Sequence, residues 1–194
     1  FDAGVHELKA DDKLVVRGGK TGTAMTADIV FFQPALSEGM PSLRAAVNAK
    51  HNLESFAPTP ARFVRFSIAK TNRGQPCLDE LEIFSGDRNV ALTSNGAVAT
   101  SSGDFVHPKH KREHINDGQY GNSKSWISEN TEGWVQIEFP DITTICRIEW
   151  ARDREGEFDD RVAIDYQIEA AVEPGKWMTL ASSADRMPVG EKQS

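Results

Sequence analysis

Apolar and polar residues alternate with a period of two along most of this chain. In residues 61–68, Ala-Arg-Phe-Val-Arg-Phe-Ser-Ile, the apolar Val64, Phe66 and Ile68 occupy every second position. Because successive side chains of a strand point to opposite faces of a sheet, this pattern predicts a strand with one face toward a core. Similar patterns predict strands at 78–84, 91–92, 97–100, 134–139, 145–150, 163–171 and 177–181.

The N-terminal part of the chain is less regular. Short alternating runs predict strands at 4–8, 13–17 and 26–32. Residues 34–60 have little strand character, and Ser42, a favoured N-cap residue, precedes a predicted short helix over 43–50. We interpret this second region as a connector.

Turn residues rather than helices separate the later strands. Pro140-Asp141, Arg154-Glu155-Gly156 and Pro174-Gly175 are such turn signals. Strands that follow one another without intervening helices favour an antiparallel sandwich over strand-helix-strand units. The sequence therefore predicts an all-β fold, and a chain of 194 residues can build such a core without a metal or a disulfide.

Charge and composition narrow the class of partner. The net charge of -7 argues against nucleic acid and anionic membranes, because both require a basic face. No apolar run approaches the roughly 20 residues that a membrane helix needs. The opening residues, Phe-Asp-Ala-Gly, do not resemble a signal peptide, so we interpret the chain as a mature or excised piece. Cys77 and Cys146 are compatible with two buried thiols or with one disulfide.

Several segments carry a family resemblance by their order and spacing. They are 89–92 with 99–102, Asn116-Asp117-Gly118 with Trp126, 133–139, 145–150, 166–169 and 175–181. Together they resemble the discoidin, or coagulation factor V/VIII type C, domains and the galactose-binding-like carbohydrate-binding modules. The resemblance covers 89–182 and implies an antiparallel jelly-roll β-sandwich.

One departure from the family pattern concerns the closing strands. Such domains end with a strand pair of the kind Ala-Arg-Tyr-Val-Arg and Ala-Glu-Ile-Glu-Val, whereas here similar strands come first, at 61–65 and 79–84. Our hypothesis is a circular permutation, in which 61–85 supply the closing strands of the 89–182 body. The domain would then be 61–194, with 1–60 as an extension or a remnant of a preceding domain. The alternative is that 1–86 end one sandwich and that a second is truncated near Ser194.

The resemblance also implies a structural calcium ion. Its charged ligands would be Asp117 and Glu80, with further oxygens from Asn116, Asn122 or Ser123 completing a shell of about 6 to 8. The alternative is an Asx-turn closed by Asp117 without a metal.

In sugar-binding relatives an arginine near the end of one strand donates hydrogen bonds to sugar hydroxyls, and an aromatic and a histidine assist it. The ligand-binding residues implied here are Arg152, Arg154, His107, His110 and Phe158. The alternative is that the alternating charges of 152–161 form a salt-bridged surface.

Other candidate metal-binding or catalytic sites have weaker support in the sequence. His107, His110 and His114 have spacings that would align on a helix for a zinc site, but Pro108 and the intervening lysines disfavour a helix. No nucleophile elbow, catalytic triad order or suitable carboxylate dyad occurs. We predict no catalysis, and a metal-dependent hydrolase would require a deep pocket at the histidines.

Three of the tryptophans are predicted to be core residues. Trp134, Trp150 and Trp177 lie within strand patterns and are predicted to be in the core.

We predict a non-catalytic carbohydrate-binding module of a secreted, periplasmic or cell-surface protein, with a glycan bound by loops at one end of the sandwich. Its partners would be extracellular glycan or polysaccharide and other domains of the same polypeptide. A protein-interaction or spacer domain without a sugar site is the alternative.

Overall fold

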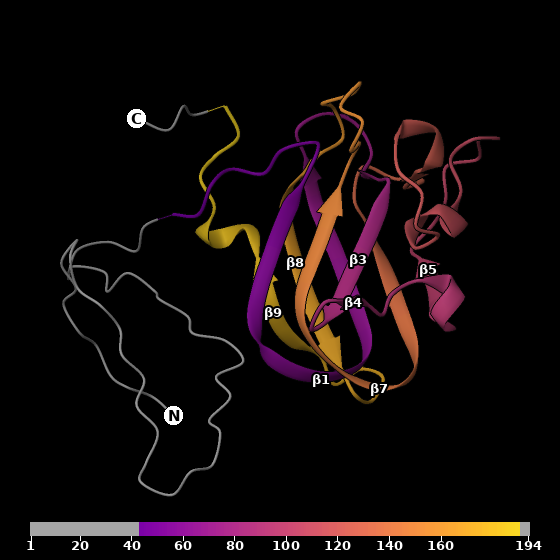
Figure 1. The fold of residues 1–194 in the computed structure, drawn as a ribbon. Coiled ribbons are helices and arrows are strands. Elements are labelled where there is room, and N and C mark those ends of the chain that lie inside the picture. Colours follow the sequence, from indigo (N-terminus) through magenta and orange to yellow (C-terminus); the bar gives the residue numbers. More distant parts are fainter. Residues whose placement is uncertain (1–42, 191–194) are drawn as a thin grey trace, which may run out of the picture. The chain divides into compact units, whose positions relative to one another are not determined.

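The structure is a computed structural model that describes residues 43–190 (Figure 1). These residues belong to one of the two compact units of the chain, the unit that begins at Leu43. The strands predicted at 4–8, 13–17 and 26–32 lie outside the described residues. The strands are β1 (Asn52–Thr71), β2 (Cys77–Leu78), β3 (Glu80–Ser85), β4 (Arg88–Asn89), β5 (Val98–Ser101), β6 (Trp126–Ile127), β7 (Gly133–Ala151), β8 (Ala163–Ala171) and β9 (Met178–Ser182). The 3-10 turns are η1 (Thr93–Asn95), η2 (Arg112–Ile115), η3 (Asn122–Lys124) and η4 (Ser183–Asp185).

Antiparallel pairing dominates this part of the chain. Seven strands form one sheet in the order β4-β3-β7-β1-β8-β9, with β5 also paired to β7, and β2 pairs with β6. Residues 43–190 contain no α-helix. The all-β prediction is therefore confirmed at the level of an antiparallel, sandwich-like fold.

The two longest strands fold the sheet over on itself. β1 and β7 pair along both of their halves, with register shifts between Ser55 and Thr59 and between Ala61 and Phe63. Both strands turn sharply where Figure 1 shows the lower end of the fold. Exposed prolines lie at this bend, where the lost ladder hydrogen bond costs least; they are Pro58, Pro60 and Pro140. The predicted break at 140–141 is thus wrong, because one bent strand runs through it.

The core lies between the two halves of the folded sheet. Phe66 on β1, Trp150 on β7 and Tyr166 on β8 meet edge to face, with ring centroids 5.1 to 5.3 Å apart. Such aromatic pairs contribute about 0.5–1.5 kcal/mol each beyond the burial of their area. The predicted alternation of β1 is confirmed, since Val64 and Ile68 are also buried.

Residues 61–85 share their sheet with the later strands. β3 pairs with the second half of β7, with Leu81 opposite Trp150 and Ile83 opposite Ile148. β1 pairs with both β7 and β8. β1 begins at Asn52, so the strand extends upstream of residue 61. The short strand expected at 91–92 is absent, and β4 lies just before it.

The helix predicted over 43–50 is wrong, because Arg44 in this segment pairs with residues 185–187 instead. Arg44 forms a parallel bridge with Arg186. The Arg44 amide donates to the Asp185 carbonyl at 2.7 Å, and the Met187 amide donates to the Arg44 carbonyl at 2.8 Å. Tertiary pairing of this kind overrides a modest local helix preference.

A buried carboxylate anchors both of these segments. Glu54 on β1 is fully buried and accepts from Arg44 at 2.5 Å and from Arg186 at 2.6 Å. The Tyr166 hydroxyl also donates to Glu54. A buried charge needs such partners, because its hydration is lost.

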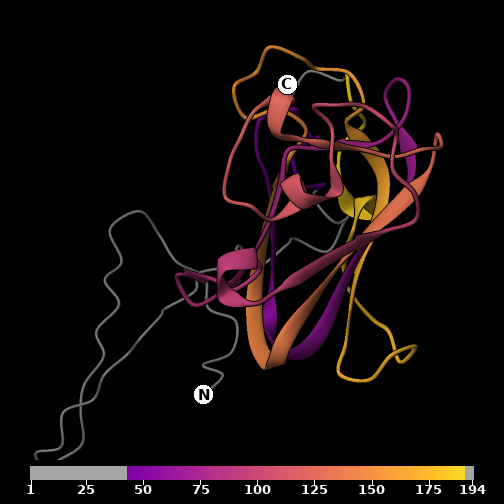
Figure 2. The same ribbon diagram turned by 90° about the vertical axis from the view of Figure 1, so that its right-hand side faces the viewer.

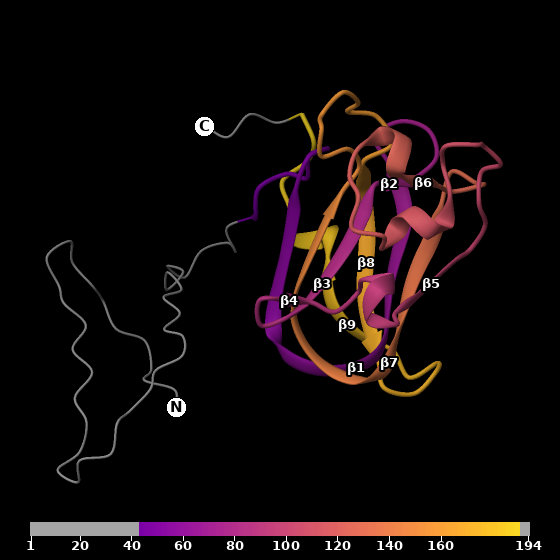
Figure 3. The ribbon, with the colours of Figure 1, turned by 45° about the vertical axis from the view of Figure 1, so that its right-hand side comes forward.

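The loops gather at the end opposite the bend. Because β1 and β7 bend in their middles, Asn52 pairs with Trp150 and Ile68 with Gly133 near their ends. The segment between β5 and β7 lies along one side of the folded sheet (Figures 2 and 3). Cys77 and Cys146 are both free thiols, so no disulfide links these parts.

Candidate functional site

Arg152, the first residue of the predicted sugar site, is held by the protein itself. Its side chain is only 3% exposed. Its Nη2 donates to Asp160 Oδ1 and its Nη1 to Asn122 Oδ1, both at 2.7 Å. Its Cζ lies 5.0 Å from the centre of the Phe158 ring. The guanidinium therefore ties the loop after β7 to η3 and has little surface left for a ligand.

Arg154 is engaged in a second internal cluster. Its Nη2 pairs with Glu82, and its Cζ lies 4.4 Å from the centre of the Tyr120 ring. The Tyr120 hydroxyl donates to Glu82 Oε1 at 3.0 Å. The alternating charges of 152–161 thus supply ion pairs within the fold, as the salt-bridge alternative expects.

His107 and His110 lie on the loop before η2, and His114 lies within η2. The rings of His107 and His110 have centroids 4.7 Å apart, and His107 stacks on Phe105 at 6.1 Å. His110 Nδ1 lies 2.9 Å from Ser125 Oγ, and burial lowers the pKa of His110. His114 instead pairs with an aspartate, so the structure does not bring the three histidines together around one ion. Within residues 43–190, no three His, Cys, Asp or Glu side chains are arranged to hold a metal.

The Asp-Gly loop forms the Asx-turn considered above. Asp117 Oδ1 accepts from the Gln119 amide at 2.8 Å, and Asp117 Oδ2 lies 2.8 Å from His114 Nδ1. Asn116 is buried and donates its side-chain amide to the Ala91 carbonyl at 2.7 Å. Both residues thus fix the loop through protein contacts.

Among the five predicted calcium ligands, Glu80 is the one with an unpartnered buried oxygen. Its Oε1 accepts from the Gly118 amide at 3.1 Å, whereas its Oε2 has no hydrogen-bond partner among the described residues. Burial raises the pKa of Glu80 to about 9, and the charge of the nearby Asp117 contributes to this rise. Asn122 is occupied by Arg152, and Ser123 is exposed. As arranged, the five residues do not form a shell of about six to eight oxygens. The calcium ion therefore stays a prediction that rests on Glu80.

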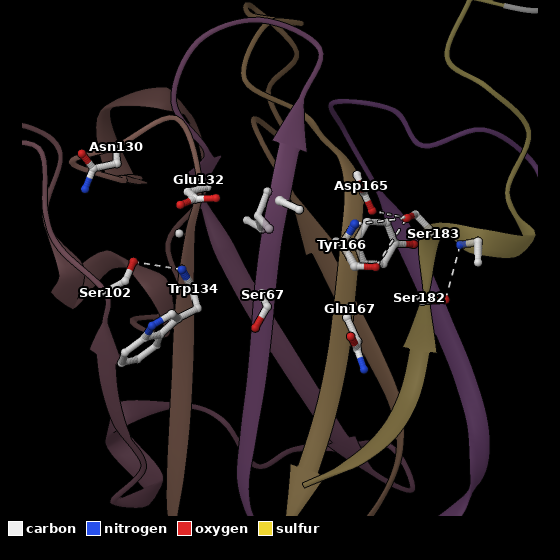
Figure 4. Close-up of a pocket in the computed structure, with 14 residues that line it drawn as sticks. Ser67, Ser102, Asn130, Glu132, Trp134, Asp165, Tyr166, Gln167, Ser182 and Ser183 are labelled. Atoms are coloured by element: carbon white, nitrogen blue, oxygen red, sulfur yellow. Dashed lines mark hydrogen bonds between the residues drawn. The ribbon is translucent and has the colours of Figure 1, made fainter. Parts of the chain in front are cut away.

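A different region of the surface offers an open groove. A groove of about 640 Å³ lies on the outer face of the sheet, over β1 and its neighbours β7 and β8 (Figure 4). Ser67 lies near its middle, with Glu132 and Trp134 on one side and Asp165 and Gln167 on the other. Sequence reasoning did not assign a role to this face.

The period of two in the strands explains the groove. Ser67 points outward because its neighbours Phe66 and Ile68 point into the core. Its cross-strand partners are Trp134 on β7 and Gln167 on β8, which are much larger. A small side chain between two large ones leaves a trough along β1.

A second small residue continues the floor toward the loops. Ile68 pairs with Tyr166 and Lys70 with Asp165, so Ala69 is the extra residue of a β-bulge. Ala69 is exposed and lines the groove. The trough is therefore floored by small side chains at successive outward positions.

The lining combines apolar surface with polar groups, and the charged groups among them are acidic. Its carboxylates are Glu132 and Asp165, and none of its residues is Lys, Arg or His. Hydroxyl and amide groups come from Ser67, Ser102, Asn130, Gln167, Ser182 and Ser183. The other lining residues are Ile68, Ala69, Gly133, Trp134, Tyr166 and Ala184. Figure 4 draws no hydrogen bond from Ser67, Asn130 or Glu132 to another lining residue. These groups are arranged to exchange hydrogen bonds with a polar ligand.

Two tryptophans stand on this outer face. Trp134 and Trp177 are partly exposed, so the prediction that both are core residues is wrong. Trp150 is fully buried, as predicted, and so is Trp126. The alternation at the start of β7 contains the missed signal: Val135 faces the core, which places Trp134 on the opposite face.

The chain matches no protein-family model, and no curated protein or solved structure is significantly similar to it. No helix in the described part of the chain is long and apolar enough to cross a bilayer.

Proposed function

We propose that this protein is a non-catalytic carbohydrate-binding module that holds an uncharged glycan in the outer-face groove. The observation that carries the proposal is the groove itself. Its volume of about 640 Å³ lies within the range of roughly 300–1,000 Å³ typical of ligand sites. It also combines the aromatic side chain of Trp134, which stands on the outer face, with hydroxyl, amide and carboxylate groups.

Sugars match this chemistry because each hydroxyl both donates and accepts. Carboxylates such as Glu132 accept from sugar hydroxyls, whereas the amides of Asn130 and Gln167 donate and accept. The apolar C–H face of a sugar ring packs against aromatic surface of the kind that Trp134 contributes.

The charge of the lining selects among glycans. A uronate or sulfate group in the groove would meet Glu132 and Asp165 without a cation in the lining to balance it. Like charges in a partly dehydrated site repel each other more strongly than in water. The supported ligand class is therefore a neutral polysaccharide.

The finer structural assignment is also a proposal. We propose a discoidin-like jelly roll in which residues 61–85 supply the closing strands for the 89–182 body. The pairing of β3 with β7 supports it, because the permutation requires that contact. The module would serve a secreted, periplasmic or cell-surface multidomain protein by keeping its other domains near extracellular glycan.

The test is a glycan array followed by affinity electrophoresis in neutral and anionic polysaccharides. Ser67→Tyr fills the groove and should weaken binding to a neutral polysaccharide by about tenfold or more, which is 1.4 kcal/mol. Thr100→Tyr is the matched control, because Thr100 is an exposed residue on the neighbouring β5 and does not line the groove. His107→Ala controls for the loop end and should leave binding unchanged.

Two results would contradict this assignment. Loss of binding in His107→Ala with retention in Ser67→Tyr would place the sugar at the loop end. Absence of binding to every glycan would favour a protein-interaction or spacer module. One observation supports that second candidate: Val106, 97% exposed, lies beside the exposed Phe105 on a loop.

A further inference from the structure

An aromatic and cationic ridge crosses the outer face next to the groove. The Arg65 Cζ lies 4.6 Å from the centre of the Trp134 ring and 4.4 Å from that of Trp177. The guanidinium also donates to Gln136 Oε1, from Nη2 at 2.9 Å and from Nε at 3.2 Å. These three side chains, Trp134, Arg65 and Trp177, form what we call the Trp-Arg-Trp ridge.

The groove ends at this ridge. On β1, Arg65 is the outward residue that precedes Ser67, and its cross-strand partners are Gln136 and Glu169. None of these three residues lines the groove, whereas Ser67 and both of its partners do. The floor of the groove is therefore low at Ser67 and is blocked at Arg65, the next outward residue along β1. Two residues of a strand span about 7 Å, so the block lies about 7 Å from Ser67.

The blocking side chain is fixed in place. A free arginine could swing aside, but Arg65 is held between two rings and by two hydrogen bonds to Gln136. Cation–π contact and the planar guanidinium favour this stacked arrangement over a mobile one. A long glycan therefore cannot continue along β1 past the ridge.

We infer that the groove binds the end of a glycan chain, with the terminal sugar against the Trp-Arg-Trp ridge. This inference rests on the proposed function and adds the part of the polymer that is recognised. Arg65 is then a specificity-determining residue: it excludes internal segments of a chain and admits ends.

The test compares long and shortened polymers of the same sugar. Purified full-length chain is titrated by isothermal calorimetry with β-1,4-glucan, β-1,4-xylan, β-1,4-mannan and α-1,4-glucan, each intact and after partial hydrolysis. An end-binding site takes up more protein per unit mass of polymer in proportion to the chain ends that hydrolysis creates. A tenfold rise in ends should give about a tenfold rise in capacity, without a change in the affinity for each site. This comparison needs no variant.

A variant then addresses the ridge. Arg65→Ser replaces the blocking side chain with one as small as Ser67 and should raise the capacity of the intact polymer toward that expected for internal sites. Thr100→Tyr, outside the groove, should leave both capacities unchanged. Equal capacity per mass for intact and hydrolysed polymer with the unaltered protein would overturn end recognition while the glycan proposal stands. Failure to bind any of the polymers or their hydrolysates would overturn both.

Discussion

Replacing Arg152 with alanine separates a structural arginine from a sugar-binding one. The substitution removes the guanidinium that joins Asp160 and Asn122, and it removes the contact with the Phe158 ring. Asn122 Oδ1 then loses its donor inside the fold. The family resemblance implied that this residue binds a ligand, whereas its 3% side-chain exposure predicts a loss of stability.

The magnitude follows from the contacts. Breaking a buried ion pair by removing one partner costs about 3–5 kcal/mol. Asp160 remains 24% exposed and can regain water, so we expect the lower end of that range, about 3 kcal/mol. In a chain of this size each kcal/mol shifts the Tm by about 2–4 °C, so the Tm should fall by roughly 6–12 °C.

The assay is thermal and urea unfolding followed by tryptophan fluorescence. Arg73→Ala is the matched control, because the Arg73 side chain is 74% exposed and its Asp159 partner is 95% exposed at 3.8 Å. Exposed pairs contribute about 0–1 kcal/mol, so the control should unfold close to the unaltered protein. An Arg152→Ala protein with an unchanged Tm that no longer binds glycan would refute the reasoning and restore Arg152 as a ligand residue.

Two further predictions concern Glu80. Burial raises the pKa of Glu80 from 4.5 to about 9. Between these two pH values the folded protein holds a proton that the unfolded chain releases. The free energy of unfolding should therefore fall as the pH rises from about 4.5 to about 9. Glu80→Gln should flatten this dependence in urea unfolding at pH 5, 7 and 9, and an equally steep dependence in the variant would assign it to other groups. Calcium bound at the unpartnered Glu80 oxygen would displace that proton, so calcium should raise the Tm, EDTA should reverse the rise, and Glu80→Gln should abolish it. A Tm insensitive to calcium and EDTA at pH 8 would contradict the calcium prediction.

Local alternation was enough to locate most strands. β8 has the bounds that the pattern predicts, and residues 61–68 lie within β1, because the period of two depends only on which face each residue presents. The same alternation fixes the outward position of Trp134. Its immediate neighbour Val135 is a core residue, so alternation alone already placed the tryptophan outside.

Contacts between distant segments decided what the pattern could not. The 43–50 segment forms no helix, and its Arg44 pairs with Arg186 in a parallel bridge. A helix preference of a few tenths of a kcal/mol per residue is outweighed by such tertiary hydrogen bonds. Residues 140–141, where a turn was predicted, lie at a bend within β7, because β1 runs alongside and keeps both halves of β7 paired.

The sequence by itself determined the class of fold, since neighbouring residues of a strand alternate between its apolar, buried face and its polar, exposed face. Only the tertiary structure decided which polar side chains are available to a ligand. The Arg152 guanidinium is occupied by hydrogen bonds to Asp160 and Asn122. The small side chain of Ser67, in contrast, leaves a groove between Trp134 and Gln167. The physical reason is that burial and pairing depend on neighbours across strands and loops, and those neighbours are set by the folding of the sheet rather than by adjacency in the chain.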